Sequence, residues 1–369
     1  MDLKRTRLYD WHQKNDATIV PFAGWELPIQ YAPGPIAEHK AVRETAGLFD
    51  IDHMGQILVE GEEATDFLNY LVTADLTKLE PWNSTYSLMC LPSGGVIDDL
   101  FVYRKGDGKG WMVVVNASNL EKDYQWILKQ SEGKKVSVTD ISEETYMIAF
   151  QGPKAIEVMD SLTDGRTGKI ERFSSGEDNL FGVKVLIGRT GYTGEDGVEL
   201  FYPADQAEKV WQGIIDHGKE IGIEVLPIGL AARDSLRFEP GFPLYGHELN
   251  EEKTPAEGLL KWACAFDKDF IGKDAIVKQI DEGLPSKLIS FELTDKGVPR
   301  EEYTVLSPEG EEIGYVATGL YAPWVDKYCG NAYVKPEFAK VGTEILIQIR
   351  KKTKKAVVIK RPLYRPSYR

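Results

Sequence analysis

The spacing of apolar residues changes near residue 285, and this change limits the folds open to the chain. Before it, helical patterns alternate with strand-like runs without a regular βαβ period. From Lys287 onward six short strand-like runs follow, from "KLISFEL" to "AVVIK", separated by turns and without a good helical pattern. Such a series predicts a small all-β barrel or sandwich after a boundary in the polar segment "KQIDEGLPS".

Length and charge set further limits. At 369 residues the chain is long enough for two or three domains. Its formal net charge is -14, which disfavours a broad nucleic-acid-binding surface. The segment from Arg350 to Arg369 carries nine Lys or Arg and no acid. These cations either form a basic strand and tail on an acidic body or face an anionic ligand or partner.

The sequence lacks the motifs of several protein classes. The three cysteines are far apart, which suggests reduced thiols instead of disulfides or a zinc site. The five histidines lack metal-ligand spacing, so no metal is expected, and no phosphate-binding loop or serine-hydrolase elbow is present. Because no signal peptide or membrane-length apolar run is visible, we expect a soluble cytoplasmic protein without membrane contact.

Two adjacent acids interrupt an apolar run. The stretch "YSLMCLPSGGVIDDLFVYR" predicts a hairpin with strands at 86–91 and 96–104, joined by a turn at 92–95. Alternation places Asp98 and Asp99 on opposite faces, both otherwise apolar, so at least one carboxylate is expected to lose solvent. Two interpretations are open. In the structural one, one acid caps a turn and the other pairs with an arginine. In the functional one, a carboxylate is held in a cleft, where it is available to a ligand.

Other charged residues stand in structured surroundings. Glu199 follows the glycine-rich "RTGYTGEDG" and lies inside a strand pattern, between Val198 and Leu200. In "GLAARDSLRFE", Arg233 and Arg237 share a helix face, where each needs an anionic partner; Asp234 and Glu239 are candidates within the segment. A further helix is expected in "SNLEKDYQWILKQ", with Ser118 and Glu121 as a capping box.

These stretches occur together in an order that resembles the glycine cleavage T-protein, or aminomethyltransferase, family. The matching segments are "VPFAGWELPIQY", "AGLFDIDHMGQ", "YSLMCLPSGGVIDDLFVY", "VVVNASNLEKD", "AFQGPKA", "RTGYTGEDGVEL", "GLAARDSLRFE" with "PLYGHEL", and "DKDFIGKDA". The resemblance implies a three-lobed (cloverleaf) α+β fold around a central tetrahydrofolate site. Residues 1–280 would form two α+β lobes and residues 285–369 the C-terminal β-barrel.

The resemblance also implies a reaction and its residues. A lipoylated H protein would deliver an aminomethyl group whose carbon passes to tetrahydrofolate, with release of ammonia, as 5,10-methylenetetrahydrofolate. Asp99 matches the key carboxylate, expected to stabilise a cationic carbon, and Glu199 the acid that holds the pterin. Asp98 is then structural. The other folate-contacting positions are Tyr86, Val114, Asn116, Tyr192, Arg233 and Arg365.

Three departures from the family pattern keep alternatives open. Asp52 stands in "FDIDHMG" where the family usually has Ser, "PAEGLLKWACAF" follows its pattern only loosely, and "TGLYAPWVDKYCGNAYV" replaces a "SGTFSPTLGK"-like stretch. The last change motivates a tetrahydrofolate-dependent demethylase, acting on a small N-, O- or S-methyl compound. A non-catalytic folate-binding homologue is less compatible, because Phe270 replaces the cysteine of its motif and Asp99 is retained.

Overall fold

The computed structural model describes residues 3–366 and 368, and the chain divides into two compact units. The first unit comprises the chain up to Leu68, Leu76–Tyr86 and Leu100–Leu236. The second comprises Asn69–Asp75, Ser87–Asp99 and the chain from Arg237 onward. Neither unit is continuous in sequence. The expected boundary near residue 285 stays a prediction, because this division does not test it.

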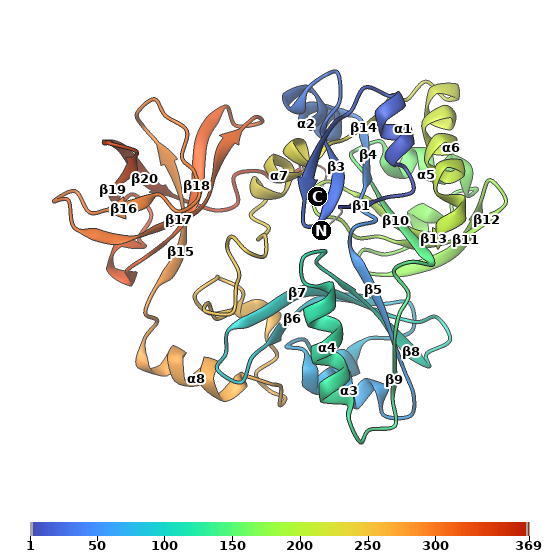
Figure 1. Ribbon diagram of the computed structural model, residues 1–369, viewed down its shortest axis with the longest axis horizontal. Coiled ribbons are helices and arrows are strands. Elements are labelled where there is room, and N and C mark those ends of the chain that lie inside the picture. Colours follow the sequence, from blue (N-terminus) through green and yellow to red (C-terminus); the bar gives the residue numbers. More distant parts are fainter. Residues whose placement is uncertain (1–2, 367, 369) are drawn as a thin grey trace. The chain divides into compact units, whose positions relative to one another are not determined.

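A six-stranded sheet organises the first unit. Its strand order is β11-β12-β13-β10-β4-β14, and β14 pairs in parallel with β4. Apolar residues of helices α5 and α6 pack with those of the sheet into a core that contains Trp211 and Phe150 (Figure 1). The elements are β11 (Ser175–Leu180), β12 (Val183–Gly188), β13 (Gly197–Pro203), β10 (Thr145–Gln151), β4 (Ala46–Asp50), β14 (Val225–Pro227), α5 (Ala155–Leu162) and α6 (Ala207–Glu220).

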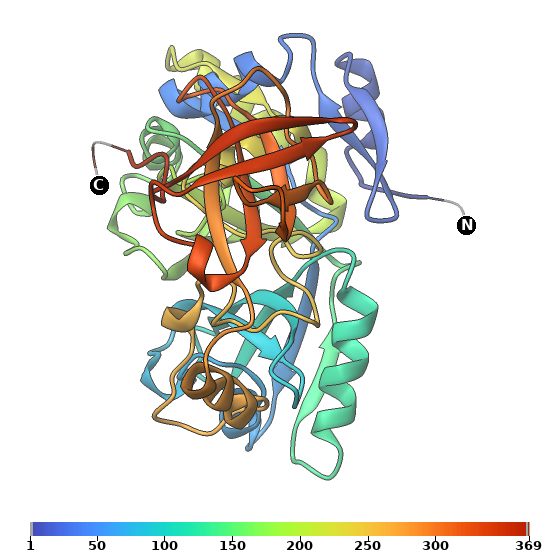
Figure 2. The same ribbon diagram turned by 90° about the vertical axis from the view of Figure 1, so that its left-hand side faces the viewer.

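A second sheet has the order β6-β7-β8-β5-β9, and α4 packs beside β9 (Figure 2). Residues of β6 and β7 belong to both units. In the first unit, Tyr103 and Val114 of this sheet share a core with Phe201 of the other. The elements are β6 (Ser84–Cys90), β7 (Val96–Arg104), β8 (Gly110–Val115), β5 (Gly55–Glu60), β9 (Ser137–Asp140), α3 (Ala64–Leu71) and α4 (Leu120–Ser131).

The predicted hairpin is present, because β7 runs from Val96 to Arg104 and β6 ends one residue before its predicted end. The capping box of α4 is wrong in detail. The helix begins at Leu120, so its N-cap is Asn119 instead of Ser118, and no side-chain cap bond forms. Burial of the helix against the sheet therefore supplies the stability that the motif was expected to give.

The N-terminal residues of the first unit close around a buried polar chain. His12 lies between two partners, with Nε2 2.8 Å from Asp50 Oδ2 and Nδ1 2.8 Å from the Tyr31 hydroxyl. Thr6 donates to the same Asp50 oxygen, so this carboxylate is fully paired and its pKa stays below its ordinary value despite burial. The N-terminal elements are β1 (Lys4–Arg5), α1 (Tyr9–Lys14), β2 (Thr18–Phe22), β3 (Trp25–Gln30) and α2 (Pro35–Glu44). Helix α7 comprises Leu230–Phe238.

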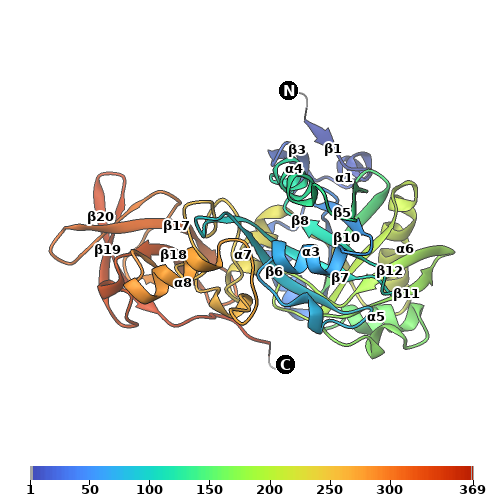
Figure 3. The same ribbon diagram turned by 90° about the horizontal axis from the view of Figure 1, so that it is seen from below.

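The second unit contains the predicted barrel. Six strands close in the order β15-β18-β17-β16-β19-β20, with β17 and β18 side by side (Figure 3). Alternating residues such as Phe291, Val316 and Ile347 fill the interior. The expected α+β fold with a C-terminal β-barrel is confirmed. The elements are α8 (Lys273–Glu282), β15 (Lys287–Leu293), β16 (Thr304–Leu306), β17 (Glu312–Ala322), β18 (Lys327–Val334), β19 (Glu344–Ile349) and β20 (Lys352–Ile359).

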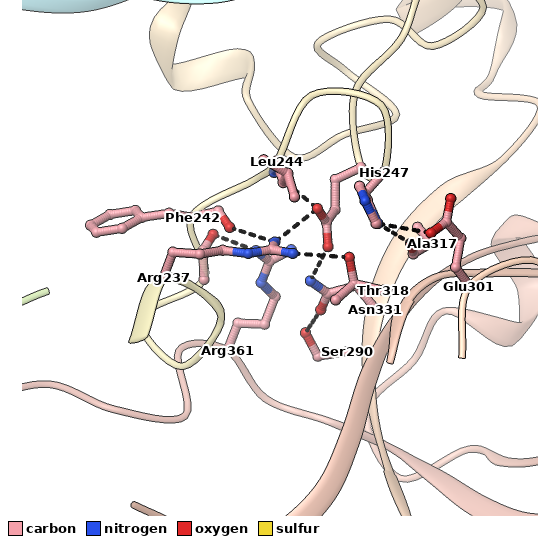
Figure 4. Close-up of polar contacts among 12 residues, drawn as sticks. Arg237, Phe242, Leu244, His247, Ser290, Glu301, Ala317, Thr318, Asn331 and Arg361 are labelled. Atoms are coloured by element: carbon pink, nitrogen blue, oxygen red, sulfur yellow. Dashed lines mark hydrogen bonds and ion pairs between the residues drawn. The ribbon is translucent and has the colours of Figure 1, made fainter. Parts of the chain in front are cut away.

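A buried ion pair joins the segment after α7 to the barrel. Arg237 Nη1 lies 2.9 Å from Glu248 Oε2, and both side chains are almost wholly buried. Arg237 also donates to Thr318 of β17 (Figure 4), and Asn331 of β18 donates to Glu248 Oε1. Burial alone would raise the pKa of Glu248, but Arg237 and the hydrogen-bond donors hold it below its ordinary value.

A second buried arginine, Arg361, also interacts with the charge of Glu248. Arg361 donates to the carbonyl of Gly241, and its pKa is lowered by burial and by the nearby positive charge of Arg237. The negative charge of Glu248 opposes that shift. Removal of the Glu248 carboxylate would leave Arg237 without this buried counter-charge and expose both arginines to their mutual repulsion.

We therefore predict that Glu248→Ala lowers the free energy of unfolding of the second unit by about 3–5 kcal/mol. The control is Glu301→Ala, because Glu301 is half exposed and only approaches His247, at 3.5 Å, so its loss should cost less than about 1 kcal/mol. Urea denaturation of both variants provides the measurement. Equal losses in the two variants would contradict a supporting role for the buried carboxylate.

Candidate active site

Glu199 is the best-defined functional candidate in the first unit. It lies in β13, where its register partners are Gly188 of β12 and Ala149 of β10. The Thr190 and Tyr103 hydroxyls lie 2.5 and 3.0 Å from Glu199 Oε2. Among the residues that the structure describes, no donor bonds to the other oxygen, Oε1. The carboxylate is thus fixed on one side and retains acceptor capacity on the other.

A missing side chain at Gly188 makes room for this arrangement. A Cβ there would lie 2.8 Å from Tyr103 Cε1, so a larger residue would displace the Tyr103 ring. A Cβ at Gly191 would lie 1.9 Å from Gln151 Oε1. Gln151 needs that place because it donates to the carbonyl of Thr190 and accepts from Thr193. The glycines of the motif therefore permit close packing of the loop against the sheet.

The loop between β12 and β13 is also held by a buried charge pair. Arg43 of α2 lies 2.8 Å from Glu195, and neither side chain is exposed. The same guanidinium donates to the carbonyls of Thr193 and Leu236, at 2.7 and 3.2 Å. One side chain thus connects the loop to α2 and to the end of α7, which carries Arg233.

Arg233 is half buried, and its guanidinium lies 5.1 Å from the centre of the Tyr192 ring. This distance allows a cation–π interaction that orients both side chains. Burial raises the pKa of Glu199, whereas its two hydroxyl donors and the charge of Arg233 oppose the rise. The structure therefore brings Glu199, Tyr192 and Arg233 into one electrostatically connected group.

Three more predicted residues belong to the first unit and lie on, or directly after, β6 and β8, the strands on either side of β7. Tyr86 is half buried near Phe101, with ring centroids 6.4 Å apart, and Phe101 stacks on Phe173. Val114 is buried in β8, opposite Phe101. Asn116 follows directly after β8 and is half buried. Their contacts with a ligand remain predictions.

Asp99 and Arg365 belong to the second unit. Asp98 is completely buried, whereas Asp99 is half buried and Arg365 is exposed. The burial of Asp98 agrees with the expectation that alternation places the two acids on opposite faces and that at least one carboxylate loses solvent. It does not test the roles assigned to Asp99 and Arg365.

Comparison with known proteins identifies the chain's relatives. The model of the GCVT N-terminal domain matches residues 8–268, and the glycine cleavage T-protein C-terminal barrel domain matches residues 287–365. The chain belongs to the glycine cleavage T-protein family. This result confirms the resemblance found in the sequence.

The similarity extends over the whole chain. An aminomethyltransferase of Thermoanaerobacter sp. (strain X514) is 45% identical and aligns with 100% of this chain and 99% of its own length. An aminomethyltransferase of Geobacillus sp. (strain WCH70) is also 45% identical, over 98% and 99%. The crystal structure of glycine cleavage system aminomethyltransferase T from Bartonella henselae superposes with a TM-score of 0.92 at 31% identity, covering 99% of both chains.

Two other features bear on the class of site. In the described part of the chain, no cluster of at least three His, Cys, Asp or Glu side chains could hold a metal ion. None of its helices is long and apolar enough to cross a membrane.

Sequence reasoning did not single out several residues that build the site. Tyr103, Thr190 and Gln151 each contact Glu199 or its loop, and the ion pair of Arg43 with Glu195 connects that loop to α2. Thr190 and Glu195 lie inside the quoted glycine-rich motif, so their position was available from the sequence. The contribution of Tyr103, Gln151 and Arg43 depends on long-range packing that no local pattern contains.

Asp52, the departure in "FDIDHMG", has an unusual environment. Burial and the neighbouring Asp50 raise the pKa of Asp52 to about 9. Its Oδ1 accepts the backbone N–H of Met147 at 3.3 Å. At neutral pH this side chain is therefore a neutral acid beside an ionised one.

This shift has a defined effect on stability. The unfolded chain releases the Asp52 proton above its ordinary pKa of 3.8, whereas the folded chain retains it until about pH 9. Asp52 therefore lowers the free energy of unfolding by an amount that increases as pH rises across that range. We predict that Asp52→Ser raises the thermal midpoint, with a gain that grows from pH 5 to pH 8 and is constant above pH 9. A gain independent of pH, measured by calorimetry, would contradict this pKa.

Proposed function

We propose that the chain is an aminomethyltransferase, which transfers the aminomethyl carbon of a lipoylated H protein to tetrahydrofolate. The observation that carries the proposal is the hydrogen bonding of the Glu199 carboxylate. Oε2 accepts hydrogen bonds from Tyr103 and Thr190, and Oε1 retains the capacity to accept from a ligand. The names of the two 45% identical relatives support the same reaction.

Glu199 suits the pterin ring of the folate. The exocyclic amino group and the adjacent ring N–H of a pterin form an edge with two donors, which a carboxylate can accept together. Tyr103 and Thr190 hold the carboxylate in place before the ligand arrives, which lowers the ordering cost of binding. Tyr192 and Arg233 provide an aromatic face and a cation nearby. Tyr86, Val114 and Asn116 are assigned to further folate contacts.

Asp99 is assigned to the chemical step. The bond between the methylene carbon and the amine nitrogen breaks. The nitrogen takes the electron pair and leaves as ammonia, so positive charge develops on the carbon. A carboxylate near this charge lowers the barrier and orients the folate nitrogens for attack. One folate nitrogen bonds to the carbon and loses its proton, which balances the proton carried away by ammonia. The second nitrogen then displaces the lipoyl sulfur, which takes up the proton of that nitrogen and leaves as a thiol. The products are methylenetetrahydrofolate, ammonia and the reduced lipoyl group.

Arg365 is assigned to the anionic part of the folate. The chain carries a net charge of -14, so an anionic ligand requires local cations. Arg365 is exposed and follows a strand rich in lysine, which gives the basic C-terminal segment a purpose. The H protein as donor and a cytoplasmic location are parts of this proposal. No observation favours the small methylated substrate of a demethylase.

The role of Glu199 predicts a proton-linked affinity. The carboxylate must be ionised to accept two donors, so tetrahydrofolate should bind with release of a proton below the raised pKa of Glu199. Affinity should then rise with pH through that pKa and level off above it. Glu199→Gln should weaken binding about tenfold or more and remove this dependence.

Titration calorimetry at several pH values measures both effects. The control is Glu177→Gln, because Glu177 is an exposed acid on the same sheet, paired only with Lys184 among the described residues. If Glu199→Gln bound tetrahydrofolate as the control does, Glu199 would not hold the pterin.

The role of Asp99 predicts a different loss. Asp99→Asn keeps the size of the side chain but removes its charge, so kcat should fall about 10²- to 10³-fold. The dissociation constant of tetrahydrofolate should change little. Single-turnover assays and binding measurements separate the two effects. The exposed Asp107, in the turn after β7, provides the control Asp107→Asn. A normal rate in Asp99→Asn would overturn its catalytic role.

A further inference from the structure

The C-terminal segment 360–366, here named the C-terminal strap, is held without belonging to a strand. The Leu363 and Tyr364 amides both donate to the carbonyl of Glu239, at 2.8 and 3.0 Å. Arg361 Nη2 donates to the carbonyl of Gly241 at 2.5 Å (Figure 4). The strap thus follows the turn that comes directly after α7, and it ends in the exposed Arg365 and the buried Pro366.

The tip of the β17–β18 hairpin, residues 323–326, contacts the same turn. The backbone N–H of Trp324 donates to Glu239 Oε1 at 2.9 Å, and Glu239 is completely buried. One residue therefore binds the tip through its side chain and the strap through its carbonyl. Val325 of the tip and Leu363 of the strap also pack into a small apolar core with residues of α7 and of three barrel strands: Phe238, Leu320, Ala322, Cys329 and Ile359.

An aromatic pair connects the tip and the strap on the surface. The rings of Trp324 and Tyr364 meet edge to face, with centroids 5.6 Å apart and an interplanar angle of 76°. This geometry is favourable beyond the burial of apolar area. Trp324 nevertheless remains 43% exposed, so core packing alone does not account for a tryptophan at this place.

We propose that Trp324 and Glu239 are positioning residues for Arg365. Glu239 fixes the hairpin tip, Trp324 packs against Tyr364, and Tyr364 precedes Arg365 in the strap. The departure "YAPWVDKY" is then a device that holds a folate-binding cation in place. It does not create a site for a different one-carbon donor. This inference rests on the proposed role of Arg365 in binding the anionic part of tetrahydrofolate.

The first arm of the test measures binding. Trp324→Ala should raise the dissociation constant and KM for tetrahydrofolate about three- to tenfold, the range that an aromatic pair of this geometry can supply, while kcat stays unchanged. Trp324→Phe keeps an aromatic ring and should restore most of the affinity, which separates lost positioning from failed folding. Glu239→Ala should act in the same direction, and Glu239→Gln, which keeps the acceptor oxygen, should act less.

The matched control is Tyr328→Ala. Tyr328 is 39% exposed on the same hairpin, but its ring packs on Tyr321, at 5.3 Å, instead of the strap. This variant should bind tetrahydrofolate like the original chain. An equal loss of affinity in Tyr328→Ala and Trp324→Ala would mean that the hairpin acts only through general stability, which would overturn the proposal.

A double-mutant cycle tests the connection to Arg365. In the Arg365→Ala background, Trp324→Ala should have little further effect, because the group that it positions is gone. Additive losses would show that Trp324 acts independently of Arg365. If Arg365→Ala alone left the affinity unchanged, both the assigned role of Arg365 and its positioning would be wrong.

The second arm measures the strap itself and does not depend on folate. Hydrogen exchange of the Leu363 and Tyr364 amides should accelerate about three- to tenfold in Trp324→Ala and stay unchanged in Tyr328→Ala. Unchanged exchange in Trp324→Ala would overturn the proposed positioning of the strap by Trp324, even if folate affinity fell. Accelerated exchange in a chain that does not bind tetrahydrofolate would instead locate the failure in the proposed function.

Discussion

The ion pair between Arg43 and Glu195 is the constraint on which the candidate site in the first unit depends. Its guanidinium bonds a carboxylate and a carbonyl of the loop that precedes β13 and a carbonyl near the end of α7. The loop contributes Thr190 and Tyr192, and the helix contributes Arg233. This junction therefore holds the loop that carries Thr190 and Tyr192 against the helix that carries Arg233.

The same physical solution recurs elsewhere in the molecule. A second buried ion pair, between Arg237 and Glu248, joins the segment after α7 to two barrel strands, and a buried hydrogen bond between His12 and Asp50 orders the N-terminal residues. Buried charge pairs of this kind contribute little net stability compared with apolar packing, but breaking one is costly. We infer that the two ion pairs specify geometry: Arg43 and Glu195 hold the loop that carries Tyr192, and Arg237 and Glu248 hold the segment after α7 against the barrel.

Much of this architecture was predictable from local pattern. The change of spacing at Lys287 predicted the barrel, and alternation along "GGVIDDLFVY" predicted a strand over 96–104 with its two acids on opposite faces. The capping box at Ser118 failed because tertiary contacts decided where α4 begins. The ion pair of Arg237 with Glu248, eleven positions along, and the hydrogen bond of Tyr103 to Glu199 depend on distant segments. No spacing rule reports such contacts.

The proposed function depends above all on which carbon group is transferred and on which molecule donates it. The most direct measurement is a single turnover with tetrahydrofolate and an H protein carrying a ¹³C-labelled aminomethyl group, run beside a panel of small methyl donors. We predict labelled 5,10-methylenetetrahydrofolate together with ammonia, and no product from the methyl donors. Formation of 5-methyltetrahydrofolate from a small donor, with no transfer from the H protein, would contradict it.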